Sequence, residues 1–148
     1  MKILAVDYGD ARTGLAVCDE LEELATPLKT ITHWDPRRVA GEIGTAAEKA
    51  GAKRIVVGHP LNMDGSAGPR AQHCEAFAEI LREVSGLPVT LWDERQTTVT
   101  ASAYLADVGV RGRKRKGLID QVAAVVILES YLRWRKNHPG EREPDGVL

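Results

Sequence analysis

Residues 1–9, MKILAVDYG, are the stretch that decides the fold. Residues 3–6 are apolar without polar alternation, which is typical of a strand covered on both faces at the centre of an α/β sheet. The strand ends at Asp7, and in open sheets of this kind ligands bind beyond the carboxyl ends of the strands. An Asp shortly before Gly9 is also a common turn residue. Taken alone, Asp7 is therefore either a turn former or a functional carboxylate.

The composition is that of a single globular domain. The 148 residues are 43% hydrophobic and 28% charged, with a net charge of −1, so the total charge indicates no class of partner. Cys18 and Cys74 form no CxxC pattern, which favours buried thiols in a reducing compartment over a zinc site. The sequence has no secretory signal and no apolar run of about 20 residues. We therefore expect a cytoplasmic protein without membrane contact.

The rest of the sequence alternates between apolar strands and amphipathic helices. Strands are expected at residues 3–6, 15–17 and 25–31, with short turns that make neighbouring strands antiparallel. Further strands at residues 54–58 and 89–92 each follow a helix, so crossover connections should place them parallel to the first strand. The prediction is an α/β fold with a five-stranded mixed sheet, three strands antiparallel and two parallel, flanked by helices.

The helices are bounded by ordinary start and stop signals. Two are expected to begin near Pro36 and Pro69 and to end at glycines, a third to run from Thr97 or Thr98 to about Ala106, and a last one to follow a basic loop at residues 109–117. We expect one domain over residues 1–136. Residues 137–148 are polar and rich in Pro and Gly, and we expect a disordered tail there.

Carboxylates fall at three positions that this fold would bring to one edge of the sheet. Asp7 ends the first strand, Asp93 and Glu94 follow the fifth, and Asp120 lies on the apolar side of the last helix. Successive strand residues point to opposite faces, so only one of Asp93 and Glu94 can face Asp7, and alternation alone does not say which. Three converging carboxylates repel one another unless cations neutralise them, and they suit Mg²⁺ or Mn²⁺.

Each of these residues also has an ordinary structural explanation. Asp120 could cap its helix, Glu94 could form a solvated ion pair with Arg95, and His59 is most simply a structural loop residue. These structural explanations are independent of one another, whereas the functional interpretations all place the residues at the same edge of the sheet. That coincidence favours a site.

Four stretches together resemble the YqgF/RuvX family of Holliday junction resolvases and pre-16S ribosomal RNA nucleases, which has a ribonuclease H-like fold. The matching segments are DYG at 7–9 with Gly14, VVGHPLNMDG at 56–65, DER at 93–95 with Thr98, and KGLIDQVAAVVIL at 116–128. The resemblance covers residues 1 to about 135. It implies a catalytic, metal-binding triad of Asp7, Glu94 and Asp120, which selects Glu94 over Asp93. His59 departs from the apolar residue usual at that point in the family.

The resemblance implies a metal-dependent nuclease that hydrolyses phosphodiester bonds with two Mg²⁺ or Mn²⁺ ions. Our first interpretation is processing of the 5′ end of pre-16S ribosomal RNA in ribosome biogenesis. The alternative is Holliday junction resolution in recombination and repair, which requires a homodimer, whereas the RNA enzyme could be a monomer or a homodimer. Basic residues are expected to hold the nucleic acid: Arg12, Arg95, Arg111, Arg113, Lys114, Arg115 and Lys116.

Two other classes of protein share parts of this pattern. Asp7, Gly9 and Gly14 also resemble the first phosphate loop of actin-like and sugar-kinase ATP-handling enzymes, but those proteins need two such domains and this chain has the length of one. A nucleic-acid-binding protein without catalysis would use the basic segment alone, and that segment could equally be solvated surface.

Overall fold

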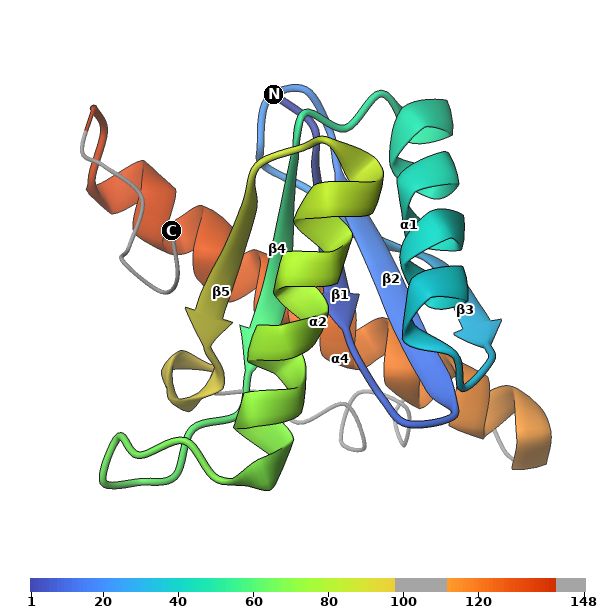
Figure 1. Ribbon diagram of the computed structural model, residues 1–148. Helices are drawn as coiled ribbons and strands as arrows, with labels where there is room; N and C mark the ends of the chain where they lie inside the picture. The colour runs from blue at the N-terminus through green and yellow to red at the C-terminus, as the bar shows by residue number, and fades with distance from the viewer. Residues whose placement is uncertain (98–111, 141–148) are drawn as a thin grey trace.

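The computed structural model describes residues 1–97 and 112–140, and the side chains of its last helix from residue 119 onward. Its five strands form one sheet in the order β3-β2-β1-β4-β5 (Figure 1). Neighbours β3, β2 and β1 pair antiparallel, whereas β4 is parallel to β1 and β5 is parallel to β4. The mixed five-stranded sheet is therefore confirmed. The strands are β1 (Ile3–Asp7), β2 (Arg12–Cys18), β3 (Ala25–Thr32), β4 (Arg54–His59) and β5 (Val89–Asp93).

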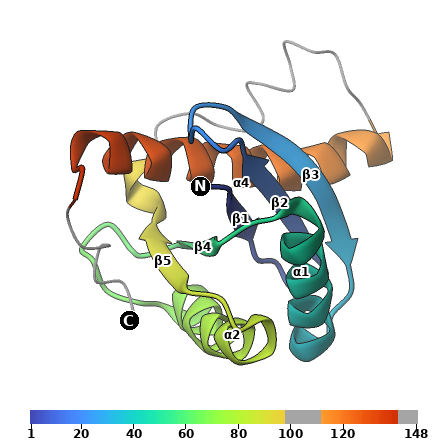
Figure 2. The same ribbon diagram turned by 90° about the horizontal axis from the view of Figure 1, so that it is seen from above.

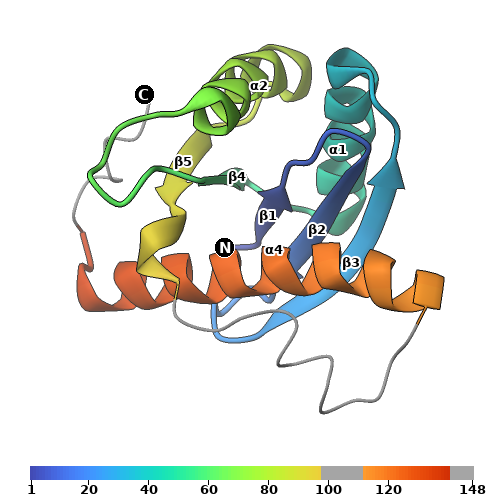
Figure 3. The ribbon, with the colours of Figure 1, turned by 90° about the horizontal axis from the view of Figure 1, so that it is seen from below.

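Helices cover both faces of the sheet. α1 (Pro36–Ala50) and α2 (Pro69–Ser85) lie on one face, and α4 (Gly112–Asn137) crosses the other (Figures 2 and 3). α1 and α2 each have proline at the first helical position and end at a glycine in the left-handed conformation, with φ of 76° at Gly51 and 70° at Gly86. These are the predicted start and stop signals.

The central strand supplies both halves of the hydrophobic core. Leu4 and Val6 pack in the cluster under α1 and α2, whereas Ile3 and Ala5 pack in the cluster under α4. Full burial on both faces explains the unbroken apolar run in the sequence. By the same alternation, Asp7 lies on the side of the sheet that α4 covers.

The predicted basic loop at residues 109–117 is wrong in its second half, because α4 begins at Gly112. Arg and Lys are good helix formers, so the run that follows Gly112 can extend the helix although glycine is unfavourable there. The predicted helix at 97–106 falls almost wholly outside the described residues, as do Arg111 and residues 141–148. Asn137 is the last residue of α4. Among the described helices, none has the length and apolar character needed to cross a bilayer.

Candidate active site

The carboxyl ends of β1, β4 and β5 point to one edge of the sheet (Figure 1). Asp7 is the last residue of β1, and Glu94 opens a short 3₁₀ helix, η1 (Glu94–Gln96), directly after β5. Glu94 reaches over the backbone of Gly58 in β4: a Cβ atom added at Gly58 would lie 3.0 Å from the Glu94 Cδ atom. The structure therefore brings Glu94 to the face of the sheet that Asp7 shares.

Asp93 is engaged elsewhere. Its Oδ1 atom accepts a hydrogen bond from the backbone N–H of Arg95 at 2.9 Å, and its Oδ2 atom accepts one from Arg95 Nη2 at 2.7 Å. The hydrogen bonds from the Arg95 side chain, with that from its backbone, lower the pKa of Asp93. Arg95 also donates to the Met63 carbonyl at 3.1 Å. Asp93 is thus the partner of Arg95, and the ion pair between Glu94 and Arg95 considered from the sequence is not formed.

Asp7 and Glu94 are desolvated and repel each other. Burial raises the pKa of Asp7 to about 6, and the negative charge of Asp120 adds to the effect. Burial raises the pKa of Glu94 to about 7, with the negative charge of Asp7 adding to it. Within the described residues neither carboxylate has a hydrogen-bond donor or an ion-pair partner. Such an arrangement is costly unless a cation enters it.

Asp120 lies beside this pair, on α4. The α4 backbone sits directly on Gly14, the β2 residue paired with Asp7: a Cβ at Gly14 would fall 2.0 Å from the Asp120 carbonyl oxygen. The Asp120 side chain accepts a hydrogen bond from Arg12 Nε at 2.9 Å. Because α4 begins at Gly112, Asp120 is well inside the helix and does not cap it. The triad residues are therefore neighbours, but the third is paired with arginine.

A divalent cation fits Asp7 and Glu94 better than it fits all three. The described residues contain no group of three or more His, Cys, Asp or Glu side chains placed to hold a metal ion. Asp7 and Glu94 nevertheless offer hard carboxylate oxygens that have no partner in the described part of the chain, and Mg²⁺ commonly uses one or two carboxylates with water completing its shell. Asp120 could join them as a ligand through Oδ1, because Arg12 binds its Oδ2 atom.

The expected nucleic-acid-binding residues are dispersed. Arg12 and Arg95 each pair with a carboxylate at the edge. Positions 113–116 lie in the first turns of α4.

His59 is the last residue of β4 rather than a loop residue, and its Nε2 atom lies 2.8 Å from Glu75 Oε2 on α2. Arg70, which the sequence analysis missed, donates from α2 to the carbonyl of Tyr8 at 2.8 Å. The sequence feature that could have indicated Arg70 is its position directly after Pro69, at the start of the helix that follows β4.

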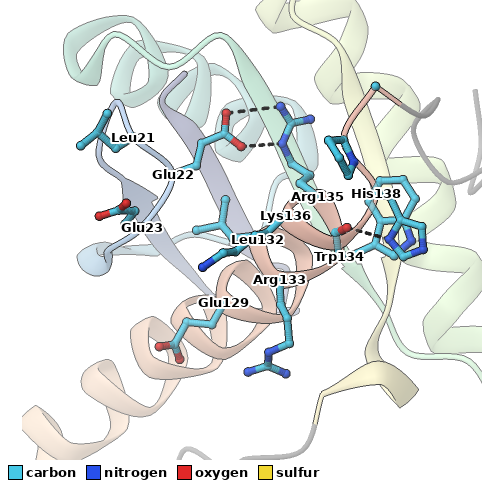
Figure 4. Close-up of a pocket in the computed structure, with 12 residues that line it drawn as sticks. Leu21, Glu22, Glu23, Glu129, Leu132, Arg133, Trp134, Arg135, Lys136 and His138 are labelled. Atoms are coloured by element: carbon cyan, nitrogen blue, oxygen red, sulfur yellow. Dashed lines mark hydrogen bonds and ion pairs between the residues drawn. The ribbon is translucent and has the colours of Figure 1, made fainter.

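A large pocket lies at the other end of the molecule, away from these carboxylates. Its volume is about 1010 Å³, and it lies between the β2–β3 turn and the end of α4 (Figure 4). Arg135 binds Glu22 there, with Nε 2.6 Å from Oε1. Trp134 stacks on His138 with ring centroids 4.7 Å apart. The pocket lacks the triad carboxylates, and its residues Glu22 and Arg135 are paired with each other, so we assign the site to the carboxylate edge and not to this pocket.

The raised pKa values predict a pH-dependent stability of the metal-free protein. When a carboxylate has a higher pKa in the folded state than in the unfolded state, its ionisation favours the unfolded state. Stability therefore falls as the pH rises between the two pKa values. Ionisation of Asp7 and Glu94 should therefore cost stability between about pH 4 and 7. In chelator at pH 8, Asp7→Asn should be more stable than the wild type by about 3 kcal/mol, and at pH 4 the two should be equal. Urea unfolding at both pH values measures this.

Glu48→Gln, which changes an exposed carboxylate on α1, is the control for that comparison and should alter stability little at either pH. Equal stabilities of the wild type and Asp7→Asn at pH 8 would contradict the desolvated pair.

Comparison with known proteins identifies the family. A family model described as "RuvX: Holliday junction resolvase" matches residues 1–134. A protein named "Putative pre-16S rRNA nuclease" from Desulfitobacterium hafniense is 42% identical over 143 residues, covering 97% of this chain and 99% of the relative. A protein of the same name from Lachnospira eligens is 44% identical over 135 residues, covering 89% and 96%.

Solved structures share the fold. RuvC of T. thermophilus in complex with a Holliday junction substrate matches with a TM-score of 0.55 at 14% identity, covering 90% of this chain and 96% of that one. The fowlpox virus Holliday junction resolvase matches with a TM-score of 0.50 at 14% identity, covering 90% and 99%. These neighbours confirm the ribonuclease H-like fold. Since the family model and the 42% identical relative both span nearly the whole chain, the protein belongs to the RuvX family of nucleases.

Proposed function

We propose that the protein is a metal-dependent nuclease that trims the 5′ end of pre-16S ribosomal RNA. The observation that carries the proposal is the pair of half-buried carboxylates, Asp7 and Glu94, at the carboxyl edge of a RuvX-family sheet. The names of the relatives that are 42% and 44% identical support the RNA substrate. Such a role corresponds to a cytoplasmic protein whose partner is nucleic acid.

The residues at the edge have distinct roles in this proposal. Asp7 and Glu94 would hold Mg²⁺ or Mn²⁺, with Asp7 fixed by its place on the central strand. The cation would supply an activated water and stabilise charge on the leaving oxygen. A second ion would use Asp120 through its Oδ1 atom, since Arg12 binds Oδ2 through Nε, and the Nη groups of Arg12 could contact phosphate. The basic positions 113–116, at the start of α4, would contact the sugar-phosphate backbone without selecting sequence.

Holliday junction resolution is the second candidate, and the description of the matching family model favours it. A resolvase cuts two strands symmetrically, so two sites must act on one junction. This function therefore requires a homodimer under cleavage conditions, whereas RNA trimming does not.

Side-by-side cleavage distinguishes the two candidates. End-labelled RNA carrying the 5′ precursor sequence of 16S rRNA and a four-way DNA junction would be incubated with the protein in Mg²⁺, in Mn²⁺ and in excess chelator. Light scattering in the same buffers gives the oligomeric state. We expect metal-dependent cleavage of the RNA. Preferential symmetric cutting of the junction by a dimer would support resolution instead. Failure to cut either substrate, or cutting in chelator, would contradict the proposed chemistry.

A further inference from the structure

Arg70 reaches from α2 to the edge where Asp7 lies. It is the second residue of α2, and its Nη2 atom donates to the carbonyl of Tyr8, the residue that follows Asp7, at 2.8 Å. Its Nη1 atom lies 3.8 Å from Asp10 Oδ1. Within the described residues these are its polar contacts, and its side chain is 52% exposed. The guanidinium therefore retains donors that solvent or a ligand can reach.

The position of Arg70 is fixed by packing between β1 and α2. The Tyr8 ring stacks on Phe77, with ring centroids 3.8 Å apart and an interplanar angle of 7°. Phe77 is buried and lies on α2, about two turns beyond Arg70. Stacking holds the middle of α2 against the residue that follows β1. The contact between Arg70 and the Tyr8 carbonyl is therefore supported by packing as well as by its own hydrogen bond.

The charge of Arg70 acts on both carboxylates of the candidate site. It lowers the pKa of Asp7 and of Glu94, although burial outweighs it at each. It forms an ion pair with neither. Arg12 and Arg95, by contrast, are hydrogen-bonded to Asp120 and Asp93. Of these three arginines, Arg70 is the one whose charge acts on both Asp7 and Glu94.

We infer that Arg70 binds the scissile phosphate of the substrate, with its free N–H groups donating to the non-bridging oxygens. The guanidinium matches phosphate geometry and keeps its charge at every working pH. A phosphodiester placed against a cation on Asp7 and Glu94 would lie within the field of Arg70, which would stabilise the negative charge that develops during hydrolysis. The inference rests on the proposed nuclease function, and the ligand class is a nucleic-acid phosphodiester.

Arg37→Gln provides a matched control for Arg70→Gln. Arg37 is also the second residue of a helix that begins with proline, its side chain is 62% exposed, and its pairing with Glu83 is similarly long at 3.5 Å. It lies on α1, so its removal takes one exposed arginine from a helix start without touching the contacts at Tyr8. Arg70→Lys keeps the charge but loses the planar fork of donors.

Three measurements on the full chain test the inference. In cleavage of the RNA, kcat/KM should fall about 100-fold for Arg70→Gln and about tenfold for Arg70→Lys, with Arg37→Gln unchanged. Mn²⁺ should bind Arg70→Gln at least as tightly as the wild type, because a positive charge near the carboxylates is gone. In an Asp7→Asn background without metal, adding Arg70→Gln should weaken binding of the same RNA several-fold, and adding Arg37→Gln should not.

Wild-type cleavage and RNA binding by the Arg70→Gln protein would overturn the inference. So would a loss of cleavage accompanied by weaker Mn²⁺ binding or a lower melting temperature, since Arg70 would then only maintain the structure of the edge. If the wild type and Arg37→Gln both fail to cleave, the proposed function fails. The binding comparison in the Asp7→Asn background still decides whether Arg70 contacts the nucleic acid.

Discussion

Asp7→Asn is expected to lower the rate of metal-dependent cleavage at least about a thousandfold while the protein stays folded. The substitution keeps the shape of the side chain at the end of β1 and removes the charge that a cation would need. The fold should survive because Asp7 has no hydrogen-bond partner to lose within the described residues. Single-turnover cleavage with saturating protein measures the effect on the chemical step.

The same assay with Glu48→Gln, a carboxylate on the surface of α1, should give the wild-type rate. Nucleic-acid binding by Asp7→Asn should remain, which separates loss of chemistry from loss of substrate. Undiminished cleavage by Asp7→Asn would remove Asp7 from the active site.

Gly58→Ala is expected to reduce cleavage about 10- to 100-fold and to cost about 1–3 kcal/mol of stability through overpacking. Gly58 lies beneath the Glu94 side chain, and an added Cβ would come within 3.0 Å of Glu94 Cδ and 3.1 Å of its Oε2 atom. The carboxylate would then have to shift by a few tenths of an ångström. Gly58 does not have the left-handed backbone conformation that would strain an alanine. Cleavage rate and Mn²⁺ affinity should fall together, and the unfolding midpoint should fall as well.

A second substitution separates the displacement of Glu94 from ordinary overpacking. The Cβ at Gly58 would also come within 2.6 Å of Ile127 Cδ1, and Ile127→Val deletes that methyl group. The double variant should recover stability but stay slow, because the clash with Glu94 remains. Recovery of the cleavage rate in the double variant would show that Gly58 matters only for packing. Gly41→Ala is the control, since its Cβ would meet nothing within 4 Å.

Apolar periodicity was sufficient to predict the sheet. The unbroken run before Asp7 is apolar because β1 is buried on both faces, and the two helical crossovers fixed the parallel strands. The positions of Asp7 and of the Asp93–Glu94 pair followed from where the strands end, and that of Asp120 from the apolar side of the last helix. The choice of Glu94 over Asp93 came from the family resemblance and not from alternation, and the structure places Glu94 over Gly58.

Pairing between side chains could not be predicted in the same way. Arg12 and Asp120 are 108 positions apart, and Arg95 selects Asp93 over the adjacent Glu94. Such choices depend on side-chain directions that sequence spacing does not determine. The start of α4 was misplaced because glycines at 112 and 117 suggested a loop, whereas the basic residues between them favour a helix. Arg70 carried no motif signal, since its role depends on the docking of α2 against β1.

Mn²⁺ titration of chelator-treated protein tests the central claim most directly, which is that Asp7 and Glu94 together form a cation site at the carboxyl edge of the sheet. Calorimetry or electron paramagnetic resonance would be applied to the wild type, Asp7→Asn, Glu94→Gln and Asp93→Asn. We predict that Asp7→Asn and Glu94→Gln each weaken Mn²⁺ binding at least about tenfold, and that Asp93→Asn, whose carboxylate binds Arg95, leaves it within about threefold of the wild type. Unchanged binding in Glu94→Gln, or loss of binding in Asp93→Asn alone, would contradict the claim.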